Sequence, residues 1–228
     1  YVGALQAWNA YQAEYITITL DDEGMQTDEI EAAMRAGPKF IYVLPNFHNP
    51  AGVTLARERR QHLVQLADRY GVPLIEDDPY GQLRYEGEHL PSLAVLDRQL
   101  QGREGVAYSG NVLYLSTFSK TLAPGLRLGW VVAPAEVIQR LVQAKQGADL
   151  HTSTLAQMIA LEVAHEGFLD RHVRFIRTVY RERRDAMIAA LQRYFPTDVH
   201  WTTPQGGLFL WVTLPEPVDA TEILHAAI

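Results

Sequence analysis

The sequence predicts an α/β protein with a mainly parallel sheet sandwiched by helices, followed by the start of a smaller α+β domain. Three observations lead to this prediction. In the first half of the chain, short apolar segments alternate with segments of helical periodicity. The apolar segments are continuous rather than interrupted by polar residues, which is typical of strands buried on both faces. In the second half, long helical segments lead to two short strands.

The expected elements follow from local patterns. Strands are expected at 15–20, 39–44, 72–75, 112–116 and 128–133. Helices are expected at 27–35 and at 56–70, the second with Thr54 as N-cap and Gly71 as its end. Leu63, Leu66 and Ala67 recur at helical spacing and should face the core. Further on, helices are expected at 135–148, 152–165 and 167–194, strands at 199–202 and 207–214, and a helix from about residue 219.

The length suggests more than one domain and less than two. A chain of 228 residues corresponds to roughly one and a half domains at about 150 residues each. The chain starts at Tyr1 and stops at Ile228 inside an apolar run, so we interpret it as a piece of a longer protein. Residues 1–174 would form a large domain that lacks its N-terminal part. Residues 175–228 would hold an interdomain helix and the start of a truncated small domain.

Composition narrows the class of protein. The chain has no cysteine, which excludes disulfides, thiolate metal sites and cysteine nucleophiles. No stretch approaches 18 uninterrupted apolar residues, so no transmembrane helix is expected. A formal net charge of −7 disfavours non-specific binding to nucleic acid or anionic membrane. We therefore expect a cytoplasmic protein without nucleic-acid or membrane partners.

Polar side chains follow three of the expected strands. In a mainly parallel sheet, ligands bind beyond the carboxyl ends of the strands. Asn49 lies after the strand at 39–44, and Asp77 and Tyr80 lie after the one at 72–75. The strand at 112–116 is followed by Thr117, Ser119, Lys120 and Arg127.

This combination suits one cofactor in particular. A lysine flanked by hydroxyls can form a Schiff base with an aldehyde, and pyridoxal 5'-phosphate is the common aldehyde cofactor. The ring nitrogen of that cofactor needs a carboxylate, its phenolic oxygen needs hydrogen-bond donors, and its phosphate needs hydroxyls and a guanidinium. The three strand-end segments contain all of these groups.

The motifs resemble those of fold-type I pyridoxal-phosphate-dependent aminotransferases of class I/II. The matching features are Asn49-Pro50-Ala51-Gly52, Asp77-x-x-Tyr80, Ser119-Lys120 and Pro124-Gly125-x-Arg127-x-Gly129-Trp130. The segment 75–93 is most similar to the branch that contains 2-aminoadipate and kynurenine aminotransferases. Residues 204–211 resemble a glycine-paired strand of the family's small domain. The resemblance covers essentially the whole chain.

The resemblance implies a role for each motif residue. Lys120 would hold the cofactor as a Schiff base and carry a proton between the substrate Cα and the cofactor. Asp77 would pair with the ring nitrogen, and Asn49 and Tyr80 would bind the phenolic oxygen. The phosphate would be bound by Thr117, where the family usually has serine, and by Ser119 and Arg127. Tyr1 would stack on the cofactor ring.

The resemblance also implies an activity and partners. We expect a transaminase that moves an amino group from a large-side-chain amino acid, of the 2-aminoadipate or aromatic type, to a 2-oxo acid such as 2-oxoglutarate. A homodimer is expected. The arginine that grips the substrate carboxylate and the first phosphate-binding turn should lie outside these residues, so we expect no transamination by this fragment alone.

Four alternatives are weighed against this interpretation. Asp77 and Asp78 could bind Mg²⁺, but no further ligands occur at suitable spacing and no metal is expected. A lyase would share the same cofactor motifs. A pyridoxal-phosphate-sensing domain of a winged-helix transcription regulator would share the fold, although there a tyrosine follows the first aspartate by two positions instead of three. A basic helical face could bind nucleic acid or, as we favour, face solvent or another domain. That face is formed by Arg171, Arg174, Arg177, Arg181 and Arg184.

Overall fold

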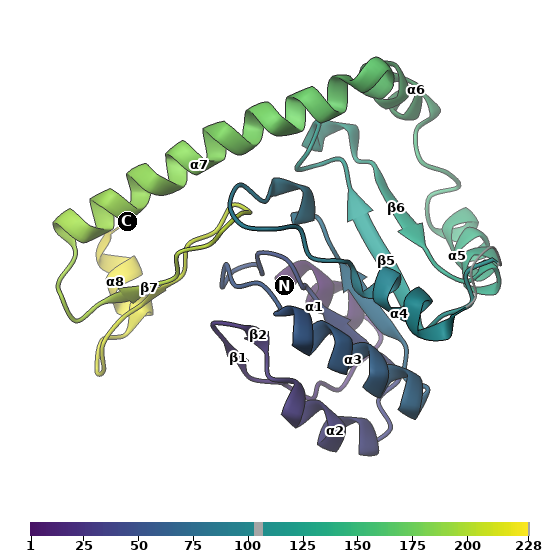
Figure 1. Ribbon diagram of the computed structural model, residues 1–228, viewed down its shortest axis with the longest axis horizontal. Coiled ribbons are helices and arrows are strands. Elements are labelled where there is room, and N and C mark those ends of the chain that lie inside the picture. Colours follow the sequence, from purple (N-terminus) through teal and green to yellow (C-terminus); the bar gives the residue numbers. More distant parts are fainter. Residues whose placement is uncertain (103–106, 228) are drawn as a thin grey trace.

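A four-stranded sheet forms the centre of the chain in the computed structural model, which describes residues 1–102 and 107–227 (Figure 1). The strands are β3 (Ile41–Val43), β4 (Leu74–Asp77), β5 (Val112–Thr117) and β6 (Gly129–Val132), in that order across the sheet. The pairs β3–β4 and β4–β5 are parallel, and β6 is antiparallel to β5. The predicted mainly parallel α/β sheet is therefore confirmed, with an antiparallel strand beside β5.

The strand register brings three carboxyl ends to one edge of the sheet. Val43 pairs with Glu76, and Asp77 pairs with Leu115. On the far side of β5, Thr117 pairs with Gly129, so β6 begins where β5 ends. The segments that follow β3, β4 and β5 consequently leave the sheet side by side.

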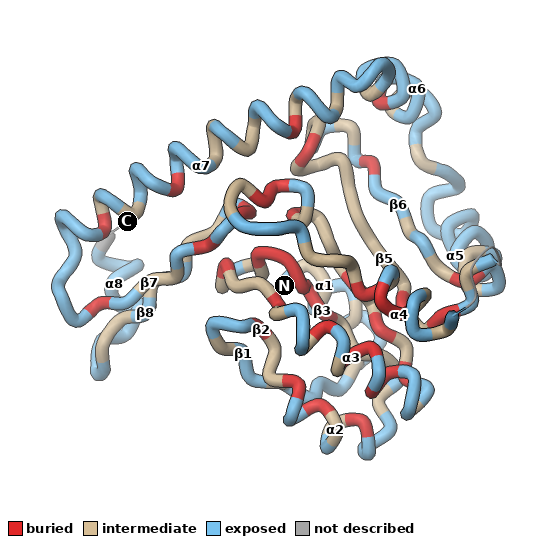
Figure 2. Tube along the Cα trace, in the orientation of Figure 1, coloured by how far each residue is buried: buried red, intermediate tan, exposed pale blue. Residues whose placement is uncertain are grey.

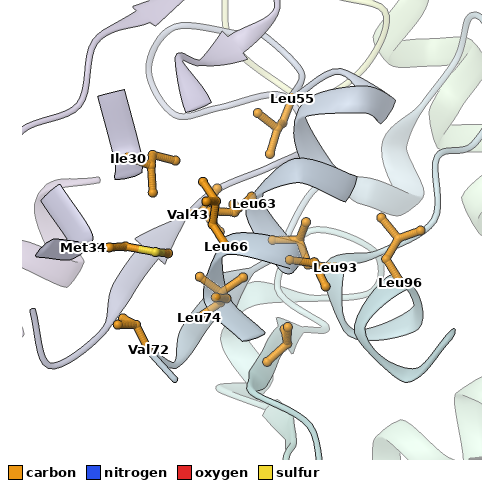
Figure 3. Close-up of a cluster of buried hydrophobic side chains, with 13 residues drawn as sticks. Ile30, Met34, Val43, Leu55, Leu63, Leu66, Val72, Leu74, Leu93 and Leu96 are labelled. Carbon is orange, nitrogen blue, oxygen red and sulfur yellow. The ribbon is translucent and has the colours of Figure 1, made fainter. Parts of the chain in front are cut away.

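Helices α2 (Thr27–Arg35), α3 (Arg57–Tyr70) and α4 (Leu93–Gln101) pack in a row over one face of this sheet. Figure 3 shows the apolar side chains that fill the space between, among them Ile30, Leu63 and Leu93 from the three helices and Leu74 from β4. Each of these four side chains is fully buried. The predicted inward face of α3 is thus confirmed.

The opposite face of the sheet carries α1 (Val2–Asn9), a helix that the sequence patterns did not indicate. The Trp8 ring lies 5.1 Å from the ring of Phe40 and 5.1 Å from that of Tyr42. Because neighbouring strand residues point to opposite faces, Tyr42 faces α1 while the next residue, Val43, enters the core under α3.

Two local expectations in the first half of the chain were wrong. The segment 15–20 is not a full strand: only β1 (Leu20–Asp21) pairs, in antiparallel fashion, with β2 (Gly24–Met25). Thr54 does not cap α3, which begins at Arg57 after Ala56. The Thr54 hydroxyl instead lies 3.4 Å from the backbone N–H of Phe47, so it supports the turn after β3.

Helix α4 was also not expected, although five of its nine residues are apolar. Its start nevertheless carries a recognisable signal, since the Ser92 hydroxyl accepts a hydrogen bond from Val95 N at 3.2 Å. Such a serine N-cap satisfies one of the backbone donors that a helix start leaves free.

The second half of the chain follows the predicted order, but the expected strand at 207–214 was wrong in its extent, because only Val212 and Thr213 are paired as a strand. It contains α5 (Ala135–Ala148), α6 (Thr154–Ala164) and the long α7 (Phe168–Tyr194), then β7 (His200–Trp201), β8 (Val212–Thr213) and α8 (Ala220–Ala227). Figure 2 shows α7 largely exposed along its length, with a few buried positions. Strands β7 and β8 pair in antiparallel fashion. Among the helices of the described residues, none has the length and apolar character needed to cross a membrane.

Candidate active site at the carboxyl edge of the sheet

Asp77, the last residue of β4, is held by a tyrosine of the neighbouring strand. The Tyr42 hydroxyl donates a hydrogen bond of 2.6 Å to Asp77 Oδ2. Asp77 is half-buried, and this burial raises the pKa of its carboxyl, while the hydrogen bond from Tyr42 acts in the opposite direction. The carboxylate is therefore fixed in place, and the hydrogen bond offsets only part of the cost of burying its charge. This is expected for a group that faces a cation.

Tyr80 lies three residues beyond Asp77, in the turn that leads into the short 3₁₀ helix η1 (Gly81–Leu83). Its side chain is only 4% exposed, and burial raises the pKa of its hydroxyl. A side-chain hydrogen bond with Asn49 lowers that pKa in turn. The structure thus brings Tyr80 and Asn49 together from two different strand ends, as the sequence predicted.

Tyr1 reaches the same region from the start of α1. Its ring folds back over Gly3, close enough that a Cβ on that glycine would collide with it. The Tyr1 hydroxyl also contributes electrostatically to the raised pKa values of Tyr42 and Tyr80, although burial is the larger cause for both. Half of the Tyr1 surface is exposed, so its ring is available to cover a ligand.

Thr117 and Ser119 form a hydroxyl pair at the end of β5. The two hydroxyl oxygens lie 2.9 Å apart, and Thr117 Oγ1 also lies 2.7 Å from the carbonyl oxygen of Leu128. Thr117 has a single hydroxyl hydrogen, so when it donates to Leu128, Ser119 donates to Thr117. The backbone N–H of Ser119 completes the arrangement at 3.1 Å from Thr117 Oγ1.

Arg127 lies directly after the 3₁₀ helix η2 (Pro124–Leu126) and next to Leu128, whose carbonyl oxygen contacts Thr117. It is exposed and has a φ of +55°, a left-handed conformation that is unusual for a residue with a side chain. Its Nη1 donates to Pro124 O at 3.1 Å, which leaves the rest of the guanidinium available. Such a strained backbone at a sheet edge is typical of functional positions.

Lys120 occupies the turn between β5 and η2. The turn is closed by backbone hydrogen bonds from Leu122 and Ala123 to Phe118 O, at 2.8 and 3.1 Å. The ring of Phe118 packs on Trp130 of β6, with ring centroids 4.8 Å apart. Within residues 1–102 and 107–227, the half-buried Lys120 amine makes no hydrogen bond or ion pair, so the chain holds the turn firmly and leaves the amine free to react.

Asp78 differs from its neighbour Asp77, because its carboxylate is used within the fold. Its Oδ1 accepts from Gly81 N and Asn46 Nδ2, both at 2.9 Å, and its Oδ2 accepts from the Tyr114 hydroxyl at 3.1 Å. These contacts give Asp78 a structural role in the turn after β4. In the part of the chain that the structure describes, no cluster of three or more His, Cys, Asp or Glu side chains could hold a metal ion.

Three supporting residues were not identified from the sequence. Tyr42 holds Asp77, as described above. Glu76 is fully buried, and its carboxylate accepts from the backbone N–H groups of Leu93 and Ala94 at 2.8 and 3.0 Å. Arg60 is fully buried on α3 and donates to Asn46 Oδ1 at 2.7 Å and to Pro45 O at 2.9 Å. A charged residue inside the apolar face of a predicted helix was the one available signal for Arg60.

The basic face of α7 makes contacts within the chain. Arg177 Nε donates to Gln82 O at 2.6 Å, and Arg181 Nε lies 3.3 Å from Glu86. Arg184 is buried and forms a bidentate ion pair with Glu86, in which Nη2 donates to Oε1 at 2.6 Å and Nη1 donates to Oε2 at 2.8 Å. Three of the five arginines thus bind the segment that follows Tyr80, so this part of the basic face is used within the chain.

A cavity of about 590 Å³ lies apart from these residues. It is lined by Asp22 and by residues of three segments, 52–56, 84–90 and 201–205. Neither Lys120 nor Asp77 lines it. Its charged lining residues are two acidic ones, Asp22 and Glu88, and one basic one, Arg84. The chemistry-bearing groups therefore define the candidate site better than cavity size does.

The carboxyl edge of this parallel sheet carries a lysine without a partner among the described residues, a fixed carboxylate, and hydroxyls with an arginine. These features define an α/β protein of the cofactor-binding kind. The family model for aminotransferases of class I and II matches residues 1–226. The chain belongs to this family, which confirms the resemblance seen in its motifs.

Relatives of known structure or curated identity lie in the expected branch. The aromatic-amino-acid aminotransferase 1 of Thermococcus litoralis is 43% identical over the whole chain. The Pyrococcus horikoshii kynurenine aminotransferase, solved with PMP, superposes on the full chain with a TM-score of 0.91 at 43% identity and is covered to 55%. The α-aminoadipate aminotransferase of Thermus thermophilus, complexed with N-(5'-phosphopyridoxyl)-L-leucine, gives 0.93 at 40% identity and is covered to 57%.

The chain spans about half the length of the curated relatives that it matches, 54% in the case of the Thermococcus enzyme. A second class of protein is also similar. The transcriptional regulator YisV of Bacillus subtilis, of the HTH type, is 34% identical over 99% of the chain, which covers 45% of that regulator. The fold alone thus does not separate enzymes from regulators.

Proposed function

We propose that the protein is a pyridoxal-phosphate-dependent aminotransferase and that Lys120 binds the cofactor covalently. One observation carries the proposal: a lysine that has no partner among the described residues, a half-buried carboxylate and a hydroxyl-arginine group lie at the ends of adjacent strands of one sheet in a chain of the aminotransferase family. No single one of these groups would suffice, since each occurs in many loops. Their placement along one sheet edge makes the combination specific.

The residues present fit the cofactor. Pyridoxal phosphate carries a pyridine nitrogen, a phenolic oxygen, a phosphate and an aldehyde, and each has a complementary group on this edge. Asp77 can face the nitrogen because burial and the Tyr42 hydrogen bond fix its carboxylate. Asn49 and Tyr80 already interact with one another and can both donate to the phenolic oxygen. Thr117, Ser119 and Arg127 offer hydroxyls and a guanidinium to the phosphate.

When bound, the cofactor supplies an aldehyde that captures amines and a ring that withdraws electrons from the substrate Cα. The chain's own residues do the rest. Asp77 would keep a negative charge beside the ring nitrogen and so favour its protonated form. The Lys120 amine would take the proton from the substrate Cα and return it to the cofactor carbon.

The proposed amino donor has a large side chain, of the 2-aminoadipate or aromatic type. This inference is supported by the named activities of the relatives described above. A 2-oxo acid such as 2-oxoglutarate would accept the amino group in the second half-reaction. We further propose a cytoplasmic homodimer in which residues 1–174 form the large domain and 175–228 begin the small one.

A second candidate function is the effector domain of a winged-helix regulator, favoured by the similarity to YisV. Such a domain would bind pyridoxal phosphate as a signal. The spacing Asp77-x-x-Tyr80 argues for the enzyme, because the regulators carry their tyrosine one position closer. A lyase on the same scaffold would share every residue discussed above, and only product analysis separates it from a transaminase.

The test uses the whole protein, with pyridoxal phosphate added and then removed by dialysis. The wild type should retain a visible absorption band from the bound cofactor, and Lys120→Ala should lose it. Lys145→Ala is a matched control, because the Lys145 amine is engaged with Asp149 at 2.8 Å on the exposed face of α5 and should leave the band unchanged. Amino acids are then screened as amino donors, with 2-oxoglutarate as the amino acceptor. Absence of a band in the wild type would refute the proposal.

A further inference from the structure

The segment Gln205–Phe209, which lies between β7 and β8, is bound to the chain that follows Tyr80. The backbone N–H groups of Tyr85 and Glu86 both donate to Gln205 O at 3.0 Å, and Gly207 N donates to Leu83 O at 3.0 Å. Arg84 and Gly206 form an isolated antiparallel bridge. Figure 1 shows this yellow part of the chain reaching back from the far end of α7 to the loop after β4.

Two glycines of this segment lie directly on Phe47. A Cβ at Gly206 would collide with the Phe47 ring, and one at Gly207 would collide with Phe47 Cβ. Phe47 is fully buried and has a φ of +49°, so its backbone conformation depends on the groups around it. The Arg84 guanidinium adds a further contact, 4.8 Å from the ring centroid. Asn49 follows Phe47 by two residues, in the same turn.

Phe209, at the end of this segment, contacts Tyr80, the second residue proposed to donate to the phenolic oxygen. The Phe209 ring meets the Tyr80 ring edge to face, with centroids 5.6 Å apart and an interplanar angle of 84°. Phe209 is half-buried and packs on the cluster formed by Leu44, Phe47, Tyr80 and Leu83. One five-residue segment therefore supports both residues assigned above to the phenolic oxygen, Asn49 through Phe47 and Tyr80 directly.

We propose that Phe209 is a positioning residue, which sets the hydroxyl of Tyr80 against the cofactor's phenolic oxygen. Through the glycine contact on Phe47, the same segment would set Asn49, so a movement of the C-terminal part of the chain changes both donors together. The inference rests on the proposed function. It adds that the chain beyond α7 influences the charge on the bound cofactor.

The consequence is a shift in the protonation of the bound cofactor. Hydrogen bonds donated to an ionised oxygen stabilise it, so they lower the pH at which the cofactor loses its proton. When Phe209 no longer braces Tyr80, that hydrogen bond weakens and the transition should move to higher pH. A residue with a purely structural role would lower stability and leave the transition where it was.

The experiment is a pH titration of the cofactor's visible absorption in the whole, loaded protein. Phe209→Leu should move the midpoint upward by about half a pH unit or more. Leu208→Ala is the matched control, since Leu208 is the adjacent, exposed side chain and should leave the midpoint unchanged. Phe209→Met provides a second change of similar volume if the leucine variant does not fold.

A double variant isolates the path through Tyr80. Tyr80→Phe alone should raise the midpoint, and adding Phe209→Leu to it should produce no further shift, because the hydroxyl that Phe209 positions is then absent. Additive shifts, or a Phe209 variant that titrates like the wild type, would overturn the inference while the proposed function stands. A wild type without any band would instead refute the proposed function.

Discussion

The Tyr42 hydroxyl donates a hydrogen bond of 2.6 Å to Asp77 Oδ2, and it does so across two parallel strands. Both groups are half-buried, and Tyr42 is itself fixed by edge contact with the Trp8 ring. Burial raises the pKa of Asp77, and this hydrogen bond is the strongest influence that lowers it. Tyr42 therefore fixes the direction of the carboxylate proposed to face the ring nitrogen and favours its ionised form.

Tyr42→Phe should weaken transamination through Asp77. A hydrogen bond to a charged group contributes about 1.5–3 kcal/mol, which corresponds to a loss of roughly ten- to hundred-fold in rate if it acts fully on the reaction. Without it the pKa of Asp77 rises further, and the carboxylate is protonated at a higher pH. The acid limb of the kcat profile should therefore move to higher pH, which steady-state kinetics between pH 5 and 8 would measure.

The control for this variant is Tyr114→Phe. Tyr114 makes the equivalent contact on the next strand, 3.1 Å from Asp78 Oδ2, but Asp78 serves the fold and is not proposed to face the cofactor. This variant should lose some stability and keep the acid limb in place. If both variants moved the acid limb of the kcat profile equally, the proposal that Tyr42 acts through Asp77 would be wrong.

Glu76 should make stability depend on pH. Burial raises the pKa of Glu76 to about 7 from an ordinary 4.5, although two backbone N–H groups favour its charged form. The folded protein thus binds a proton more tightly than the unfolded chain does. The contribution of this group is fully present below about pH 4.5 and is lost as the pH rises through about 7, with an upper bound of about 3 kcal/mol.

Glu76→Gln removes that titration and keeps an oxygen that can accept from Leu93 N. The free energy of unfolding, measured with urea at several pH values, should fall more steeply toward pH 8 for the wild type than for the variant. Other titrating groups cancel in the difference between the two proteins. A difference that stays constant from pH 5 to pH 8 would contradict the role assigned to Glu76.

Whether a structural feature could be predicted from the sequence depends on how far apart along the chain its residues lie. Strand ends and helix faces depend on nearby residues, so the three strand-end segments and the inward face of α3 could be found by pattern. A parallel sheet then implies that Asp77, Asn49 and Tyr80 share one edge. Their roles toward a cofactor remain predictions.

Contacts between distant residues could not be found in this way. The Arg84 guanidinium meets Gln205 Oε1 at 2.8 Å across 121 positions of sequence. Glu76 caps a helix that begins 17 positions later, and this helix was itself missed. Likewise, no local pattern states whether Tyr42 or its neighbour Val43 faces Asp77. Each of these depends on strand register and helix packing, which appear only in three dimensions.

Arg184 should contribute more to stability than a surface arginine. It binds both oxygens of Glu86 and the carbonyl of Pro204 at 2.8 Å, so it joins α7 to two other segments. Its side chain is 7% exposed, and removing it leaves Glu86 without its main partner. Arg184→Ala should lower the free energy of unfolding by about 2–3 kcal/mol at neutral pH.

The pH dependence provides a second check on Arg184. The Arg184 hydrogen bond lowers the pKa of Glu86, so this stabilisation is present above the ordinary pKa of a glutamate and is lost as the pH falls through the lowered value. The gap between wild type and Arg184→Ala should therefore narrow in acid. Lys145→Ala, which breaks an exposed pair on α5, should cost less than about 1 kcal/mol. Equal costs for the two variants would contradict the assignment.

Gly207 should be far less tolerant of a side chain than Gly37, although both have nearly the same backbone conformation. Their φ values are +73° and +71°, so alanine at either position costs about 1–2 kcal/mol for a left-handed backbone. Nothing lies within 4 Å of a Cβ at Gly37, whereas a Cβ at Gly207 would run into Phe47. Gly207→Ala should therefore cost at least about 2 kcal/mol more than Gly37→Ala in urea unfolding, because the packed Phe47 cannot move aside freely. If the two substitutions proved equally costly, the close approach of Gly207 to Phe47 would have no energetic weight.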